Sequence, residues 1–466
     1  INNVALGLQA LNLNTTGNNN TAVGYQALDA NTTATDCTAV GAQALGQNTT
    51  GNNNTAVGKD TLQANTTGSN NAGFGAFALD ASTTGSSNTG IGIGSLGSNT
   101  SASNNTAVGY DALFANTNGG ENVAVGARAL DISTTGSYNT AIGTSALGSN
   151  TTASQNTACG RDALFSNTTG NQNTAVGYNT LDANTTGVEI VAVGTQALGS
   201  NTTGHFNTAV GRDALFSNTT GTRNVAVGHN ALDATTTSAN NTAVGAGALT
   251  NNTATENTAV GSDALEDTTS GTGNVGVGRL AGYNITTGEH NTCIGRRAGD
   301  TLTTGSRNIC IGNDAETAAV TNTDCIVMGS STVGKGTRTF WVEPDLGVYH
   351  GGNTTTWSTT SDRRIKKNIV DNNEGLSLIN QIAVKNFEYK TAEEIEADGE
   401  LPTHEAVNKT GTQIGVIAQE LQEVRSSWVT TRENGTLSLT ATDEIMWHLV
   451  NAVKELSAKV AALEAN

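Results

Sequence analysis

The sequence predicts a mainly β protein, most of which is a parallel β-roll, or β-solenoid, of twenty turns with about seventeen residues each. The first observation is a glycine that recurs every seventeen residues from Gly7 to Gly245 and, after one step of sixteen, every seventeen again to Gly329. The second is an alternation of β-branched and small residues before each glycine, which is typical of a short strand. A third is the persistence of this pattern over residues 1–335, because a disordered polar tract would not keep it in register.

The composition of the chain argues against two classes of partner, nucleic acids and membranes. The chain has 466 residues, of which 56 are glycine and 13% are charged, and its formal net charge is −18. An acidic balance of this size argues against binding to a phosphate backbone, so we expect no nucleic-acid partner. No apolar stretch reaches the roughly 18 residues of a membrane-spanning helix, so we expect no membrane insertion. The first residues already form a repeat copy, and we therefore expect no signal peptide.

The repeat is numbered here from its glycine, which is position 0. Positions −3 and −1 carry Thr, Val or Ile, whereas positions −4 and −2 carry Asn and Ala, as in residues 20–24. We expect both faces of this strand to be buried, with the branched side chains filling a core and the small ones admitting a neighbouring backbone. We read that small face as the surface on which neighbouring chains of a trimer approach each other.

The rest of each turn follows the same logic. Leu at position +4, from Leu11 onward, predicts a ladder of stacked leucines. The Asn-Thr-Thr-Gly segment that follows, as at residues 48–51, predicts a turn in which Asn and Gly adopt positive φ. Stacked Asn and Thr side chains are expected to form hydrogen bonds from one turn to the next.

A longer period of 51 residues, or three turns, is superposed on the repeat. Asp-Ala-Leu-Phe recurs at residues 111, 162 and 213, which indicates duplication of a three-turn block. The recurring aspartates are expected to be solvated loop residues, since an active site is normally unique. The phenylalanines would stand about 14 Å apart along the axis at about 4.8 Å per turn.

The five cysteines occupy repeat positions otherwise held by Asn, Ala or Val. Cys293 and Cys310 lie one turn apart, within the Cα separation that a disulfide tolerates. We favour the simpler interpretation that they are buried thiols in an alanine slot. There is no Cys/His cluster with the spacing of metal ligands, so neither a metal nor a cofactor is expected.

Composition changes at residue 336. Residues 336–360 read as a β-rich neck, in which Trp341 and Trp357 could stack on carbohydrate but more simply cap the open end of the rod. Ser361 and Lys366 follow, five residues apart. A lysine amine can replace histidine as general base to a serine hydroxyl, although Ser and Lys pairs are common and this spacing alone is a weak signal.

The last segment, residues 443–466, predicts a helix with a coiled-coil seam. Leu449, Leu456 and Leu463 are seven residues apart and are flanked by Val453 and Val460. This pattern is consistent with a three-helix coil, although three heptads do not fix the number of strands.

Two resemblances add to this reading. Residues 1–335 resemble the left-handed parallel β-roll heads of trimeric autotransporter adhesins and the shafts of some phage tail fibres, with a longer loop in each turn. Residues 361–466 resemble the endosialidase-type intramolecular chaperone domain of phage tailspikes and fibres. The carrying motifs are Ser-Asp-x-Arg-x-Lys-x-x-Ile at residues 361–369 and the segments 375–379, 384–389, 414–421 and 449–456.

The second resemblance implies a small α+β domain that trimerises, holds three chains in register and then cuts itself off. It implies cleavage between Ser361 and Asp362, with Ser361 as catalytic serine and Lys366 as general base. The further motif residues that it implies to support the site are Asp362, Arg364, Gln419 and Glu420. Residues 425–428 depart from the family's pattern, which often has a proline there, and are interpreted as a loop.

Three functions remain in comparison. The first is a homotrimeric tail fibre or tailspike of a virion, which binds a host-cell surface receptor, possibly a glycan, and cleaves itself as a serine autoprotease. The second is a bacterial surface adhesin, which would be extracellular and should carry a C-terminal membrane anchor. The third is a solenoid enzyme that degrades glycans, which predicts a unique pair of carboxylates. The sequence favours the first.

Overall fold

The computed structural model describes residues 2–343, 370–398, 410–431, 436–439 and 442–465. The chain divides into two compact units, Ile1–Asp314 and Ala315–Asn466. Each unit is described by itself.

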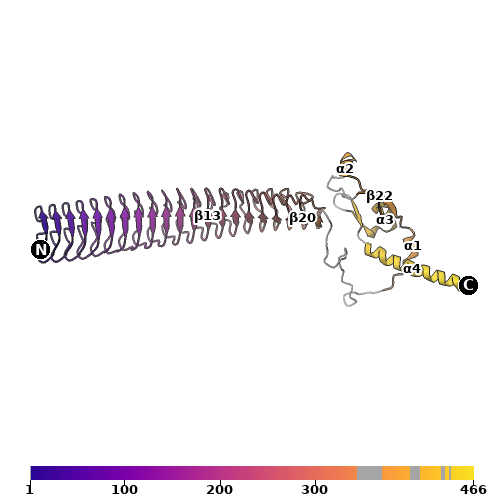
Figure 1. Cartoon of the computed structure of the whole chain (residues 1–466), viewed down its shortest axis with the longest axis horizontal. Coiled ribbons are helices and arrows are strands. Elements are labelled where there is room, and N and C mark those ends of the chain that lie inside the picture. The colour runs from indigo at the N-terminus through magenta and orange to yellow at the C-terminus, as the bar shows by residue number, and fades with distance from the viewer. Residues whose placement is uncertain (1, 344–369, 399–409, 432–435, 440–441, 466) are drawn as a thin grey trace. The chain divides into compact units, whose positions relative to one another are not determined.

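The first unit is a stack of turns, each contributing one three-residue strand (Figure 1). Its strands are β1 (Val4–Leu6), β2 (Thr21–Val23), β3 (Thr38–Val40), β4 (Thr55–Val57), β5 (Ala72–Phe74), β6 (Thr89–Ile91), β7 (Thr106–Val108), β8 (Val123–Val125), β9 (Thr140–Ile142) and β10 (Thr157–Cys159). They continue as β11 (Thr174–Val176), β12 (Val191–Val193), β13 (Thr208–Val210), β14 (Val225–Val227), β15 (Thr242–Val244), β16 (Thr258–Val260), β17 (Val275–Val277), β18 (Thr292–Ile294) and β19 (Ile309–Ile311).

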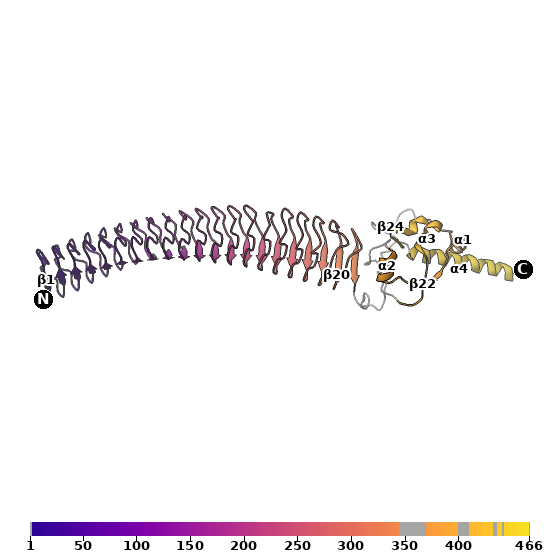
Figure 2. The same cartoon turned by 90° about the horizontal axis from the view of Figure 1, so that it is seen from above.

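Each strand pairs in parallel with the strand one turn away, and every repeat position stacks on its own copy. Ala22, for example, lies opposite Ala39. The strands form one long side of the stack and the turn segments form the other (Figure 2). The predicted fold class, a parallel β-solenoid with one strand per turn, is therefore confirmed. The single sixteen-residue step keeps Thr242 opposite Thr258, so the turn segment rather than the strand absorbs the missing residue.

The predicted orientation of the strand faces is wrong. Ala at position −2 points inward and is fully buried, as in Ala22 and Ala39, whereas Val40 at position −1 is 36% exposed. The reason is the leucine at position +4, whose buried side chain occupies the narrow core. A Cβ built on Gly276, a position −2 residue, would lie only 2.8 Å from Cγ of Leu265. The core therefore accepts a methyl group from the strand and excludes a larger side chain.

The repeat glycine is required by close approach within the chain. Gly24 has φ of +140°, and a Cβ there would lie 2.4 Å from the carbonyl oxygen of Gly41 in the next turn. The small residues thus admit the backbone of the next turn, and they are not a surface for another chain.

Positive φ occurs at positions that the turn chemistry did not predict. Leu28 at position +4 has φ of 52° and Gln26 at position +2 has φ of 54°. The turn glycines at position +10, such as Gly51, are outside this region and are needed for space, because a Cβ on Gly51 would lie 2.1 Å from the oxygen of Gly68. A left-handed leucine is costly, by about 1–2 kcal/mol. Its burial and its backbone hydrogen bond to the next turn hold it in place.

The predicted side-chain ladders are confirmed. At position +7, Asn65 Nδ2 donates to Asn48 Oδ1 at 2.7 Å. At position −4, Asn71 Oδ1 accepts from the backbone N–H of Asn88 at 3.0 Å. The Thr49 hydroxyl donates to the carbonyl of Thr66 at 2.9 Å. The buried asparagines thus exchange their hydrogen bonds between turns, as buried polar groups require.

The three-turn period has a packing role at position +5. This position cycles through Gly, Phe and Asp, as in Gly148, Phe165 and Asp182. A Cβ on Gly148 would meet the Phe165 ring at 3.0 Å, and Gly97 and Gly199 face Phe114 and Phe216 in the same way. Each phenylalanine ring therefore lies over the glycine of the preceding turn.

The five cysteines, all of which lie in described residues, form no disulfide with one another, and the favoured prediction of buried thiols holds for four of them. Cys293 and Cys310 lie in register at position −2 and are buried. Cys159, at position −1, is the exposed one. These thiols fill repeat positions without forming a cross-link.

The second unit begins with strands of the same kind. β20 (Ile326–Gly329) pairs in parallel with β21 (Phe340–Glu343), which is the described part of the predicted neck. Lys335 Nζ lies 4.9 Å from the ring centroid of Trp341. Trp357 lies outside the described residues.

The remainder of the second unit is a small α+β domain. Its elements are α1 (Leu376–Ile379), β22 (Lys385–Phe387), α2 (Ala392–Asp398), β23 (Gln413–Gly415), α3 (Ala418–Val424), the 3-10 turn η3 (Ser426–Trp428), β24 (Val429–Thr431), β25 (Leu437–Leu439) and α4 (Thr442–Glu464). β22 pairs with β23 and β24 pairs with β25, both antiparallel. The predicted α+β class and final helix are confirmed.

Candidate functional site

The proposed cleavage centre falls on residues that the structure does not describe. Ser361, Asp362, Arg364 and Lys366 all lie in the segment 344–369. The candidate site is therefore built from the described residues that follow it in the chain.

Gln419 and Glu420 lie in the first turn of α3, where both side chains are exposed. Glu420 Oε1 lies 3.3 Å from Lys385 Nζ on β22. Behind them a shallow hollow is lined by Ile382, Val416, Leu421 and Val424. The structure thus places both predicted motif residues on one exposed helix turn, beside the strand that the first half of the domain contributes.

A compact core holds these elements together. Leu421, Trp428 and Val429 are buried at its centre, and Trp428 is fully enclosed. Side chains from four other segments pack against them, including Leu378 of α1 and Ile445 of α4. Trp428 is the largest buried side chain of this core, so we expect the stability of the domain to depend on it.

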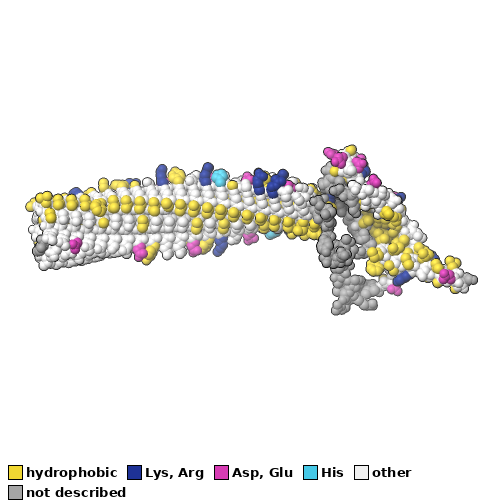
Figure 3. All heavy atoms as spheres, viewed as in Figure 1, with side chains coloured by type: hydrophobic (Ala, Val, Ile, Leu, Met, Phe, Trp, Pro, Cys, Tyr) yellow, Lys and Arg dark blue, Asp and Glu magenta, His cyan; other side chains and the backbone are white. Residues whose placement is uncertain are grey.

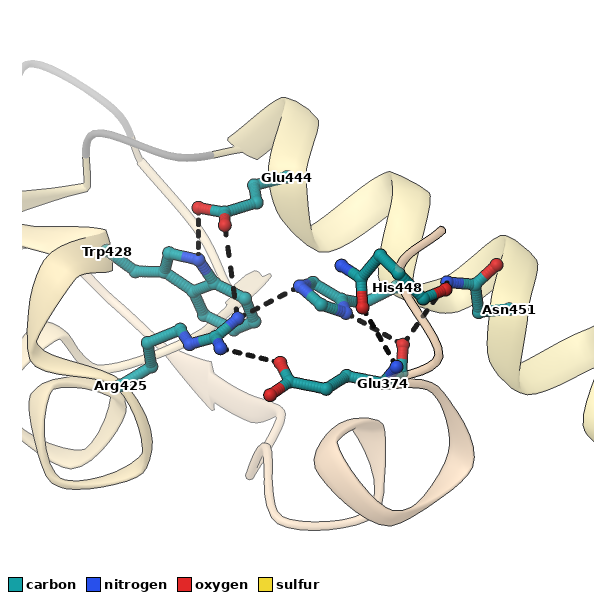
Figure 4. A network of polar contacts seen from close by, with 7 residues as sticks. Glu374, Arg425, Trp428, Glu444, His448 and Asn451 are labelled. Carbon is teal, nitrogen blue, oxygen red and sulfur yellow. Dashed lines mark hydrogen bonds and ion pairs between the residues drawn. The ribbon is translucent and has the colours of Figure 1, made fainter. Parts of the chain in front are cut away.

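Arg425 lies at the centre of a network of polar contacts (Figure 4). Its guanidinium donates to Glu374 Oε2 at 2.5 Å and to His448 Nε2 at 3.0 Å. Its Cζ also lies 5.3 Å from the ring centroid of Trp428, whose indole N–H donates to Glu444 at 2.6 Å. The network joins the segment before α1, the end of α3 and the first half of α4.

The contacts of His448 define its tautomer. A guanidinium can only donate, so Nε2 of this buried imidazole accepts from Arg425 and carries no proton. The proton lies on Nδ1, which donates to the backbone carbonyl of Glu374 at 2.9 Å. The neutral histidine therefore bridges α4 to the segment before α1.

These residues were missed at the sequence level. We interpreted residues 425–428 as a loop, but Arg425 caps α3 and Trp428 ends a 3-10 turn inside the core. A signal was available, because a lone tryptophan in an otherwise polar segment is rarely left in solvent. The partners of Arg425 come from positions 51 residues earlier and 23 residues later, which no local pattern reveals.

Gly375 marks the closest approach of α1 and α4. A Cβ there would lie 2.7 Å from the backbone nitrogen of Ala452 and 2.8 Å from the backbone carbon of Asn451. The N–H of Leu376 donates to Glu455 Oε2 at 3.3 Å. α4 is therefore seated directly on the turn that begins α1.

A second side of α4, about a quarter turn around the helix from His448 and Ala452, is apolar and exposed within this chain. The predicted seam residues Leu449, Leu456 and Leu463 are 50%, 51% and 75% exposed, and Val453 is 58% exposed. His448 and Ala452, by contrast, are buried against the domain. The helix thus has one face packed on its own domain and one free apolar face.

The recurring aspartates of the rod are more buried than solvated loop residues would be. Burial raises the pKa of Asp80, and the negative charge of Asp60 in the preceding turn raises it further. The same arrangement joins Asp111 with Asp131, Asp162 with Asp182, and Asp213 with Asp233. The pairs repeat with the turns, so they belong to the repeat's own chemistry and mark no unique active site.

Within the ranges that the structure describes, no three His, Cys, Asp or Glu side chains are grouped to hold a metal ion. In the same ranges, no helix has the length and hydropathy needed to span a membrane.

Comparison with known proteins gives one match. Residues 361–430 match a family model described as chaperone of endosialidase. The matched segment contains the Ser361 motif and α1 to α3, whereas α4 lies beyond it. No curated protein and no solved structure was found to match the chain.

Proposed function

Proceeding from an endosialidase-type chaperone domain at residues 361–430 that follows a β-solenoid, we propose that this chain is a tail fibre or tailspike subunit with an intramolecular chaperone. That combination fits the architecture of endosialidase-type tail proteins. The domain brings three copies together, holds them in register while the rod forms, and then separates itself from the rod.

The exposed seam of α4 supports the trimer. An amphipathic helix whose leucines recur at heptad spacing and stay half-exposed needs partner helices to bury them. Three linked chains raise the local concentration of strands, which favours the slow parallel pairing of the rod.

The proposed cleavage uses a Ser-Lys pair. Lys366 accepts the proton of the Ser361 hydroxyl, and in the net reaction one water molecule is added across the peptide bond from Ser361 to Asp362, which leaves a carboxylate on Ser361 and a free amine on Asp362. Asp362 and Arg364 complete the motif around this pair, and Gln419 and Glu420 support it from the exposed turn of α3. The rod itself is assigned no enzymatic activity.

The mature rod is proposed to contact the host cell. A long repetitive surface is suited to a repetitive receptor such as a glycan, and the virion is the place where a tail fibre meets it. The network around Arg425 has a separate role, since it stabilises the chaperone.

Denaturing electrophoresis tests the cleavage. We expect the wild-type chain to release a fragment of about 105 residues, corresponding to residues 362–466. Ser361→Ala and Lys366→Ala should remain full length, whereas the matched controls Ser358→Ala and Lys367→Ala should cleave. A wild-type chain that stays intact after refolding, or a Lys366→Ala chain that cleaves, would refute the assignment.

Light scattering on the uncut Ser361→Ala chain tests the assembly. The expected mass is three times 47.3 kDa. A monomer mass would remove the trimer from the proposal while leaving the cleavage test unaffected.

A further inference from the structure

The outer face of the sheet in the first unit carries a continuous column of apolar side chains at position −1, beside a column at position −3 that is mainly threonine. It consists of positions −3 and −1 of strands β1 to β19, which we call the outer sheet face. Position −1 is occupied by Leu6, Val23, Val40, Val57, Phe74, Ile91, Val108, Val125, Ile142, Cys159, Val176, Val193, Val210, Val227, Val244, Val260, Val277, Ile294 and Ile311. A line of hydrophobic side chains runs along the rod in Figure 3.

This face is at least partly exposed along its whole length, and its strands carry no charge. Eleven of the nineteen side chains at position −1 are exposed, as in Phe74 at 42% and Ile142 at 43%, and the other eight are partly exposed. Position −3 carries Thr, Val, Ile or Ala, and no strand from β1 to β19 contains a charged residue. The charges of the rod lie at other repeat positions, such as Lys59 and Asp60. A monomeric protein rarely leaves an apolar column of this length in contact with solvent.

Its area is that of a protein interface. Nineteen strands at about 4.8 Å spacing make it about 85 Å long, and two columns of side chains make it about 10 Å wide. The resulting footprint of about 850 Å², shared by the apolar column and the mainly threonine column, is large enough to hold an interface of the standard size of roughly 800 Å² per partner.

We propose that the outer sheet face is the surface along which copies of this chain pack in the rod. The inference rests on the trimer proposed above and assigns its contact surface outside the chaperone domain. A partner must offer an apolar surface with the same spacing over about 85 Å, and a second copy of this chain supplies it by construction. Any other partner would need apolar groups that repeat with the spacing of the turns, about 4.8 Å, over the same length.

The packing places equivalent residues of three copies around a common axis. Position −1 side chains at the same height then meet across the axis and lose their remaining exposure to water. Threonines at position −3, such as Thr106 and Thr140, lie beside this column and can exchange hydroxyl hydrogen bonds between copies. The charged positions stay on the outside of the assembly.

One native residue makes the proposal testable without redesign. Cys159 is the position −1 residue of β10 and is exposed, whereas the other four cysteines are buried. In the proposed packing, the Cys159 thiols of different copies come within the Cα separation of a disulfide. Two thiols lose two protons and give two electrons to an added oxidant, copper(II) phenanthroline, and form one interchain bond.

The experiment uses the uncut Ser361→Ala chain, treated with copper(II) phenanthroline and separated by non-reducing electrophoresis. We expect most of the protein to run as covalent pairs, with one chain in three left single because a trimer holds an odd number of thiols. Cys159→Ser should abolish the pairs. The matched control is Thr152→Cys in the Cys159→Ser background, since Thr152 is exposed but lies off the outer sheet face; it should form none.

The two proposals fail separately. A trimer mass with no Cys159 pairs, or with pairs formed equally through Thr152→Cys, overturns the assignment of the outer sheet face and leaves the trimer standing. A monomer mass overturns the trimer itself, and the interface with it.

Discussion

Two residues of the repeat, the repeat glycine and the leucine at position +4, have positive φ angles that close packing maintains. Gly24 combines a positive φ with a carbonyl oxygen 2.4 Å from its missing Cβ, so no other residue fits there. Leu28 holds a left-handed backbone that is unfavourable for leucine, and it keeps it because its side chain fills the core. The turn is thus stabilised by the neighbours above and below it more than by its own sequence preferences.

The half-buried aspartates contribute less to the stability of the rod at neutral pH than at low pH. Burial raises the pKa of Asp131, and the neighbouring Asp111 adds to the shift. A carboxyl whose pKa is higher in the folded state binds its proton earlier there than in the unfolded chain. Stability therefore falls as pH rises from the ordinary carboxyl value of 3.8 through the raised pKa.

We expect a variant with Asp80, Asp131, Asp182 and Asp233 all changed to Asn to unfold at a higher temperature than wild type at pH 7. The gain should be on the order of a few tenths of a kcal/mol per site, because these groups are partly screened by solvent. The difference should vanish near pH 3, where both chains are neutral at these sites. Asp371→Asn, an exposed residue outside the rod, is the control. Equal pH profiles for the variant and wild type would contradict the shifts.

At the scale of single residues, the sequence predicted which positions stack from turn to turn, but it did not predict which side of the strand faces the core. Alternation showed that Ala22 and Val23 lie on opposite sides of a strand, but a period of two carries no sign that says which side is inside. That choice depends on the leucine across the core, whose left-handed backbone no propensity predicts. The asparagine ladders were predictable, since buried asparagine in register has few other partners.

Among the elements, α4 is the one with two functions on two faces. Its inner face carries His448 and Ala452, which join it to α1 and to Arg425. Its outer face carries the heptad leucines. The seam was visible in the sequence, because one helix encodes it locally. The inner contacts were not, because Glu374 and Arg425 reach α4 from distant positions.

Gly375→Ala should release α4 from its domain. The added Cβ would lie under 3 Å from backbone atoms of Asn451 and Ala452, which cannot rotate away. We expect a loss of about 1–3 kcal/mol in the stability of this domain and faster hydrogen exchange in α4. Ser377→Ala, an exposed change in the same helix, should stay within about 0.5 kcal/mol of wild type. Unchanged exchange in α4 for Gly375→Ala would show that the close approach is absent.

Over the whole chain, the rod and the C-terminal domain differ in the kind of contact that stabilises them. In the rod, each turn contacts only its neighbours, so its stability is a sum of near-identical interfaces. The domain around Trp428 contains contacts between distant positions and specifies a single arrangement. The segment 344–369, which carries Ser361 and Lys366, is known here from its sequence motif and the family match alone.

The three-turn cycle at position +5 gives a test at this scale. Deleting the 51 residues 132–182 keeps the order Gly, Phe, Asp and should leave the unfolding temperature of the rod nearly unchanged. Deleting only the 17 residues 132–148 places Phe165 on Asp131 in place of Gly148, and should cost about 1–3 kcal/mol at that junction. Thermal unfolding of both deletions in the uncut chain makes the comparison. If the shorter deletion is as stable as the longer one, the Phe-over-Gly contact has no energetic role.

The glycine under each phenylalanine also bears on how such a rod changes over generations. Recombination between segments 51 residues apart returns every ring to a glycine, and therefore adds or removes three turns without a new contact to be selected. Recombination at 17 residues leaves one mismatched junction for selection to act against. The length of the rod can consequently change in steps of about 14 Å without a new contact at position +5.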